Sequence, residues 1–251
     1  MLGTIERTGQ LLKLFTLETP VWRISEMAQA LNCSTSTTYD LASSLVQIGL
    51  LKQSADRRYE IGWRVFEMSQ VVLGSSSLQA EARKGMTQLS RKFNETVLLG
   101  VSAGGKILFA DKISPKQSLF NSVSPPDMRF QMHCTAAGKV IMAHLTEEER
   151  ESVLKEHGFE PLTPHSVPSR IRLDEELAEV VTQGYATAYE EAVIGLGCIA
   201  APIVDYSGGV LASLCLAAEI DQFGTHFEAY RRDLVQIANQ VSRRLGGLIF
   251  D

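Results

Sequence analysis

The sequence predicts an α+β protein with two domains joined by a helical linker. Residues 24–62 show two amphipathic helical patterns followed by a pair of short strands. Helical periodicity continues through 63–73 and stops at the small residues 74–77, whereas short β-like runs alternate with helices from residue 96 onward. The expected segments are a winged N-terminal domain at 1–62, a linker helix with a hinge at 63–77 and a second domain at 78–251.

The helix-corner-helix pattern of residues 24–49 follows an expected helix over Glu6–Leu17. Ser25 and Ser34 stand where N-cap residues are favoured, because their hydroxyls accept hydrogen bonds from free backbone amides. Gly49 then ends the second helix. The apolar stripe of that second helix is expected to run through Tyr39, Leu41 or Ala42, Leu45 and Ile48.

Two short strands, Leu50–Gln53 and Arg58–Ile61, are expected next, with a polar turn between them. This order of helices and strands describes a winged helix-turn-helix, so DNA binding is the first function to consider. Hydroxyls and free amides at a helix start can donate to phosphates, and wing cations can hold the DNA backbone. The candidate DNA-contacting residues are Ser34, Ser36, Thr37, Thr38, Tyr39, Gln47, Lys52, Arg57 and Arg58.

Charge is distributed unevenly between the two parts of the chain. The formal net charge is −5, yet residues 1–76 carry seven basic and seven acidic side chains, so the excess acid lies in 77–251. A neutral N-terminal domain binds DNA only if its bases share one face. Asp40 stands in the middle of the second helix. One alternative therefore stays open, a small-molecule-binding protein with a degenerate DNA-binding head.

The sequence pattern of the second half of the chain predicts an antiparallel sheet with helices before and after it. Gly104 and Gly105 stand between two β-like runs and predict a hairpin. Residues 158–172 are expected to form an irregular loop. The expected strands are Thr96–Ser102, Lys106–Lys112, Ser118–Val123, Tyr185–Tyr189, Gly197–Val204 and Val210–Ala217. The expected helices are Leu78–Phe93, Thr135–Leu145, Glu147–His157, Asp174–Gln183 and Gln222–Leu248.

Other classes of protein are disfavoured. No apolar run approaches the roughly 18 residues of a membrane span, and the N-terminus does not resemble a signal peptide, so a cytoplasmic protein is expected. The four cysteines are far apart and form no CxxC pair, which favours reduced thiols over a disulfide or a zinc site. No GxSxG or triad pattern occurs, so neither an enzyme nor a cofactor is expected. An enzyme that uses Cys198 is the weakest alternative.

Four segments resemble the IclR family of bacterial transcription regulators over about residues 3–248. They read ERTGQLLKLF, then STSTTYDLASSLVQIGLL with RRYEIG, then MHCTAAGKVIMAHL, and finally GYATAYEEAVIGLGCIAAPIVDYSGGVLASL. The resemblance implies a winged helix, a linker helix and a C-terminal GAF-like domain that senses a small organic molecule. It also implies a homodimer or tetramer on double-stranded, palindromic operator DNA. The apolar residues of the expected linker helix fit such an assembly, since they suit contact with a second protomer.

The expected effector pocket begins at residues 135–139, which open a helix. Thr135 starts that helix, and the free amides there can receive a carboxylate. The resemblance implies that Ala136, Ala137 and Cys198 line the cavity. It implies further apolar lining at Leu119, Phe130 and Leu196.

The chain departs from the family pattern at three pocket positions. The family commonly has Asp where this chain has Ala188, and small hydroxyl residues where it has Cys215 and Ala217. Because three polar partners are missing, we expect an effector less hydrophilic than glyoxylate or pyruvate, for example an aromatic or medium-chain carboxylate. The alternative is that these positions are ordinary core packing.

Overall fold

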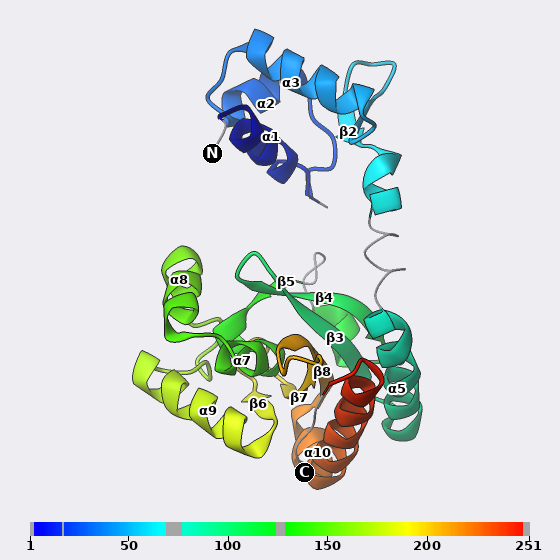
Figure 1. Ribbon diagram of the computed structural model, residues 1–251, viewed down its shortest axis with the longest axis vertical. Helices are drawn as coiled ribbons and strands as arrows, with labels where there is room; N and C mark the ends of the chain where they lie inside the picture. Colours follow the sequence, from blue (N-terminus) through cyan, green and yellow to red (C-terminus); the bar gives the residue numbers. More distant parts are fainter. Residues whose placement is uncertain (1–2, 17, 69–76, 124–128, 248–251) are drawn as a thin grey trace. The chain divides into compact units, whose positions relative to one another are not determined.

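The computed structural model describes residues 3–16, 18–68, 77–123 and 129–247. The chain separates into two compact units, Met1–Ser76 and Ser77–Asp251, each with its own buried core (Figure 1). Among the described residues, no helix is both long enough and apolar enough to cross a membrane.

The first unit is a three-helix domain with a two-stranded antiparallel wing. Lys52 pairs with Glu60 in the wing, and the isolated bridge between Trp22 and Tyr59 joins a third segment to it. The winged helix-turn-helix prediction is confirmed. The elements are α1 (Gly3–Lys13), α2 (Ile24–Ala30), α3 (Thr35–Gln47), β1 (Leu51–Gln53) and β2 (Tyr59–Ile61).

The ends of α3 follow the sequence signals. The Ser34 hydroxyl accepts a hydrogen bond from the Thr37 amide at 3.1 Å, which caps the helix as predicted. Gly49 follows the helix with a φ of +77°, and the Leu50 amide donates to the Leu45 carbonyl at 2.9 Å. This closing turn needs a left-handed residue, which glycine supplies without strain.

Three local predictions for this unit are wrong. Ser25 lies inside α2, whose N-cap is Arg23, because the Glu26 carboxylate accepts from the Arg23 amide at 2.8 Å. The first helix ends at Lys13, before the predicted Leu17, which is outside the described residues. In α3 the predicted stripe residues Tyr39 and Ile48 are exposed. Ala42 and Leu45 of the same predicted stripe are buried as expected. They form the core of this unit with Leu11, Met27, Leu51 and Tyr59.

The second unit is built on a six-stranded antiparallel sheet in the order β5-β4-β3-β8-β7-β6. Its strands are β3 (Thr96–Ala103), β4 (Lys106–Ile113), β5 (Arg129–Gln131), β6 (Ala186–Tyr189), β7 (Leu196–Val204) and β8 (Val210–Glu219). Its helices are α5 (Ser77–Phe93), α6 (Leu119–Val123), α7 (Ala136–Ala143), α8 (Glu147–His157), α9 (Arg170–Gln183) and α10 (Ile220–Arg244), with a 3-10 turn η1 (Met132–Cys134).

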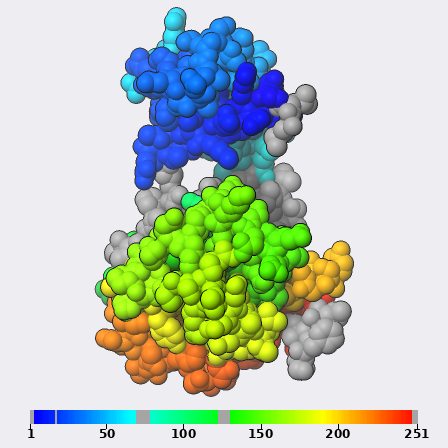
Figure 2. Space-filling view, turned by 90° about the vertical axis from the view of Figure 1, so that its left-hand side faces the viewer, coloured from blue at the N-terminus to red at the C-terminus, as the bar shows by residue number. Residues whose placement is uncertain are grey.

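Helices cover both faces of this sheet. Leu98 packs with α7, α8 and α9 on one face, whereas its neighbours Val97 and Leu99 pack with α5 and α10 on the other. Successive side chains of a strand point to opposite faces, so each strand contributes to two cores. Figure 2 views this unit from the side of α8 and α9, whose side chains (green to yellow) cover the sheet there.

The sheet prediction is confirmed in outline and corrected in three places. Gly104 and Gly105 form the predicted hairpin with φ values of +57° and +72°. The predicted strand Ser118–Val123 is wrong: this segment forms α6, because the Ser118 and Asn121 amides bond three residues back in single helical turns. The short strand β5 was not predicted. Helix α9 begins before Asp174, since Ser169 caps it through the Arg172 amide at 3.2 Å.

The predicted linker helix is described only in part. Residues 63–68 are helical, and 69–73 lie outside the described residues. Trp63 is 75% exposed and meets Phe66 edge to face, with 6.0 Å between ring centroids. Met68 is also exposed. These side chains leave an apolar surface on the first unit.

Candidate functional site

The exposed face of α3 carries two of the predicted DNA-contacting residues, Ser36 and Gln47. Ser36, Asp40, Ser43 and Gln47 recur at helical spacing, and none of the four is buried. Asp40 therefore shares the face on which the hydroxyl and amide side chains lie, so a carboxylate stands in the middle of the candidate reading surface. Of the remaining candidates, Ser34, Thr37, Tyr39, Lys52, Arg57 and Arg58 are also exposed or half-buried.

Thr38 does not belong to this surface. Its side chain is 0% exposed, and its hydroxyl donates to the Ser34 carbonyl at 3.0 Å. The residue fills a core position of α3, between the half-buried Thr37 and the exposed Tyr39, because the helical period turns every third or fourth residue inward. The prediction that Thr38 contacts DNA is therefore withdrawn.

The wing presents three cations in different electrostatic settings. Lys52 pairs with Glu60 at 2.9 Å, and Arg58 pairs with Asp56 at 2.7 Å. A hydrogen bond from Ser54, aided by the Arg58 charge, lowers the pKa of Asp56, so that carboxylate stays ionised. Within the described residues Arg57 makes no ion pair, and it stands at the tip of the turn with a φ of +62°.

The second unit contains an apolar cavity of about 30 Å³ between the sheet and α7. Three aromatic rings form one wall, with Phe109 edge to face against Phe120 and Phe130 at 6.3 and 5.6 Å. One water molecule needs about 10–15 Å³ of such space, so the cavity has room for only a few small groups. The lining residues are Leu98, Phe109, Phe120, Phe130, Cys134, Thr135, Ala136, Ala188, Glu191, Ala192, Val193, Leu196, Cys198 and Cys215.

Seven of the ten predicted effector residues line this cavity: Phe130, Thr135, Ala136, Ala188, Leu196, Cys198 and Cys215. The other three do not. Ala137 faces β3, where it lies close to Gly100, and Ala217 is buried in the sheet beside Cys198 in register. Leu119 lines a neighbouring cleft of about 330 Å³, because α6 replaces the predicted strand there.

The start of α7 forms one edge of the cavity. The Thr135 hydroxyl caps the helix by accepting from the Gly138 amide at 3.0 Å. Gly138 is required at this place, since a β-carbon there would lie 2.2 Å from the Met132 carbonyl oxygen. The backbone of the 3-10 turn η1 thus packs directly against the first turn of α7.

A buried ion-pair network connects the cavity to α9. The Lys139 ammonium is 1% exposed and lies 2.7 Å from both carboxylate oxygens of Glu191 and 2.7 Å from Glu176. Arg172 contacts Glu176 at 3.2 Å, so the four charges cancel. Burial raises the pKa of Glu191, and the Lys139 charge opposes that shift. Glu191 is the charged side chain among the lining residues.

Sequence reasoning missed this network. Residues 135–139 were interpreted only as a helix start, although Lys139 inside an apolar helix was a signal for a buried cation. Glu190 and Glu191 follow the end of β6. Glu190 accepts a hydrogen bond from the Gly195 amide at 2.7 Å, and Glu191 pairs with Lys139.

The neighbouring cleft carries a second perturbed carboxylate. Glu95 lines it at the junction of α5 and β3 and accepts a hydrogen bond from the Tyr230 hydroxyl at 3.3 Å. Burial, with a smaller repulsion from Glu219, raises the pKa of Glu95 to about 7. Burial and the Glu95 charge likewise raise the pKa of Tyr230.

Comparison with known proteins assigns both units. A model of the IclR helix-turn-helix domain matches residues 4–55, and a model described as bacterial transcriptional regulator IclR C-terminal matches residues 70–243. The chain is 30% identical over 250 residues to the HTH-type transcriptional regulator XynR of Escherichia coli, covering 98% of both proteins.

Solved structures agree with the fold. A regulator from Silicibacter sp. TM1040 superposes with a TM-score of 0.86 at 21% identity, covering 99% of this chain and 98% of that one. An IclR homolog from Microbacterium hydrocarbonoxydans, complexed with 4-hydroxybenzoate, superposes with a TM-score of 0.81 at 22% identity, covering 96% and 98%. The chain belongs to the IclR family of DNA-binding transcription regulators, in which a helix-turn-helix domain precedes a C-terminal ligand-binding domain.

Proposed function

We propose that the chain binds operator DNA through the exposed face of α3 and through the wing, and that an organic acid in the cavity of the second unit controls this binding. The observation that carries the first part is the set of exposed and half-buried hydroxyls at the start of α3. The wing adds Arg57, which makes no ion pair among the described residues. Such hydroxyls position a helix on phosphates or contact base edges, and the arginine adds charge.

The proposed effector is an aromatic or medium-chain carboxylate. Three rings and the apolar Ala188 offer little to a small hydrophilic acid, whereas they suit a ring or an alkyl chain. The first turn of α7 is the place for the carboxylate. Support also comes from the fold neighbour that carries 4-hydroxybenzoate, an aromatic acid of this class.

Glu191 narrows this proposal further. Its carboxylate is the negatively charged group of the cavity lining. Its ammonium partner Lys139 is buried and is not among the lining residues. An effector that reaches Glu191 with a second anionic group is repelled, whereas a hydroxyl can donate to it. We therefore expect an acid with a hydroxyl group to bind more tightly than the matching diacid.

The cavity must expand to admit such a molecule. Its volume of about 30 Å³ is far below that of an organic acid. Binding therefore favours a conformation of the lining that differs from this one, and that difference supplies the coupling to the rest of the chain. Effector couplings of this kind are about 1–3 kcal/mol.

Fluorescence anisotropy with the chain's own promoter DNA tests both parts. Specific binding that weakens with salt is expected, followed by a shift when aromatic and medium-chain acids are added. Ala188→Asp should weaken the response to the active acid about tenfold without changing operator affinity. Ala178→Asp, on the exposed side of α9, is the matched control. Specific DNA binding that none of these acids alters would contradict the effector proposal.

A homodimer or a dimer of dimers is proposed for the working protein. The apolar surface of Trp63, Phe66 and Met68 is larger than a solvent-facing helix turn normally exposes. When two N-terminal domains are held together in a dimer, binding of the first to a palindromic operator raises the effective concentration of the second at the other half-site. The dimer therefore binds more tightly than either domain alone. Light scattering should show an even-numbered oligomer, and Trp63→Glu should lower its stability. A monomer at micromolar concentration would exclude this proposal.

A small-molecule-binding protein with a degenerate head is the second candidate. Asp40 on the α3 face, together with the ion-paired Lys52 and Arg58, favours it. The same anisotropy experiment separates the two candidates, because a degenerate head binds its promoter no more tightly than scrambled DNA.

A further inference from the structure

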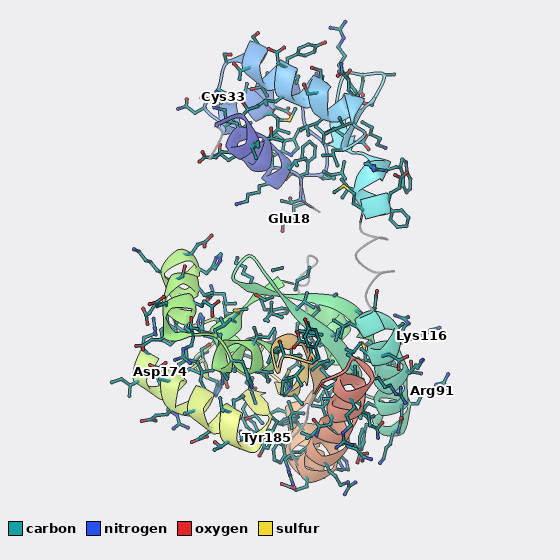
Figure 3. The ribbon with its side chains drawn as sticks, viewed as in Figure 1. Glu18, Cys33, Arg91, Lys116, Asp174 and Tyr185 are labelled. Carbon is teal, nitrogen blue, oxygen red and sulfur yellow. The ribbon has the colours of Figure 1, made fainter. Side chains whose placement is uncertain are left out.

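Three of the four cysteines of the chain line the same small cavity. Cys134, Cys198 and Cys215 come from η1, β7 and β8, whereas Cys33 belongs to the first unit (Figure 3). All four are free thiols.

Cys198 and Cys215 are diagonal neighbours on adjacent antiparallel strands. Cys198 pairs with Ala217 and Cys215 pairs with Ala200, so the two thiols lie on one face of the sheet with one residue pair between them. Their interaction and burial together raise the pKa of Cys215 well above its usual range. Cys134 is held differently, because its thiol donates to the Ser166 hydroxyl at 3.9 Å.

A direct disulfide suits this diagonal pair poorly. Diagonal residues in an antiparallel ladder are about 7–8 Å apart, whereas disulfides usually join α-carbons about 4.4–6.8 Å apart. One atom bonded to both sulfurs can span the longer distance between the two cysteines without a movement of the strands. The site therefore fits a bridging centre better than it fits an S–S bond.

An adduct without net charge suits the apolar lining best. Two thiolates around a monovalent metal ion leave a net negative charge in a cavity of low polarity, which is costly. A trivalent centre that forms covalent bonds to both sulfurs and keeps one neutral group leaves no charge. Soft centres of this kind prefer sulfur over the oxygen ligands of water.

We propose that Cys198 and Cys215 form a two-sulfur site for a compact, neutral compound of trivalent arsenic, with arsenous acid as the probe. Two As–S bonds form and two As–OH bonds break. Each thiol proton leaves with one hydroxide as water, and the third hydroxyl stays on arsenic. The oxidation state of arsenic does not change, so the step needs no oxidant or reductant. Its product is neutral, as the cavity requires.

The regulatory consequence rests on the function proposed above. Because the site is part of the effector cavity, arsenic on the two sulfurs occupies space that the organic acid needs. The acid should then lose its effect on operator binding. Formation of the adduct itself does not depend on DNA binding, so the two proposals fail separately.

Native mass spectrometry of the reduced full-length protein with arsenous acid tests the site. One arsenic per chain is expected in the native protein and in Cys33→Ser, the matched control from the other unit. Cys215→Ser and Cys198→Ser should each lose the adduct, and Cys134→Ser should retain it. Cys198 is half-buried, so its variant stays informative if Cys215→Ser fails to fold. Arsenic retained by either of these two variants, or lost from Cys134→Ser, would overturn the assignment.

Discussion

The Lys139 ammonium lies 2.7 Å from Glu191, so a fully buried cation directly backs the carboxylate that lines the ligand cavity. The pair joins α7 to the segment after β6, and Glu176 of α9 completes it from the other side. Charges buried at this depth are tolerated only when paired. The network therefore holds three elements around the cavity in one arrangement.

Replacing Lys139 by Met should destabilise the second unit by about 3–5 kcal/mol, because two carboxylates lose their shared cation. Burial already raises the pKa of Glu191, and without the ammonium that pKa rises further. Protonation of Glu191 removes the unpaired buried charge, so the variant should lose less stability at pH 5 than at pH 8. Urea unfolding at both pH values measures it. An equal loss at both would show that packing, not charge, is what Lys139 contributes.

Replacing each of two helical glycines by alanine should change the stability of the protein in opposite directions. At Gly138 the added β-carbon would lie 2.2 Å from the Met132 carbonyl oxygen, so the start of α7 must shift, at a cost of about 3 kcal/mol. At Gly224, inside α10, nothing lies within 4 Å, and alanine should stabilise the helix by about 0.5–1 kcal/mol. Thermal unfolding of both variants compares the two sites. A stabilised Gly138→Ala would contradict the described packing.

The helix-turn-helix and most of the sheet were predictable because their signals are local. Ser34, Gly49 and the Gly104-Gly105 pair act through their own backbone geometry, and the structure places all of them as expected. Of the seven candidates that line the cavity, six followed from the family resemblance and Thr135 from the predicted helix start. Thr38 was misplaced because helical phase, not residue type, decides which hydroxyl is buried.

Contacts between distant segments account for what could not be predicted. The Lys139–Glu191 pair joins residues 52 positions apart, and nothing in either local pattern indicates the partner. Helix α6 forms where Phe120 packs into the core, so tertiary packing overrides a β-like pattern. Cavity volume depends on all of these contacts at once.

Glu95→Gln should stabilise the protein above pH 7 and change little below pH 4. The folded pKa of Glu95 is about 7, above its ordinary value of 4.5, so the unfolded chain ionises first as pH rises. Native stability is thereby lost between those two pH values. Because Glu95 is only half-buried, solvent screening limits the gain to about 1 kcal/mol. Thermal unfolding from pH 4 to 8 measures this, and a gain that is the same across that range would refute the assignment.

The two neighbouring arginines of the wing should differ in their effect on DNA binding. Arg57 makes no ion pair among the described residues, whereas Arg58 is neutralised by Asp56. Arg57→Asn should reduce the slope of log affinity against log salt by about 1, and Arg58→Asn by less. Asparagine tolerates the positive φ of position 57, so the turn is kept. Equal effects in a salt titration would mean that the Asp56 pair opens on DNA.

Asp40→Asn should strengthen operator binding several-fold. The carboxylate shares the exposed face of α3 with Ser36 and Gln47, so it stands close to phosphates when that face enters a groove. Removing one negative charge there lowers repulsion at nearly constant shape. Anisotropy at two salt concentrations distinguishes a charge effect, which shrinks with salt, from a base contact, which does not. A loss of affinity for one base change only would instead identify Asp40 as an acceptor for cytosine N4. No change in affinity would mean that α3 enters the groove with Asp40 turned toward solvent.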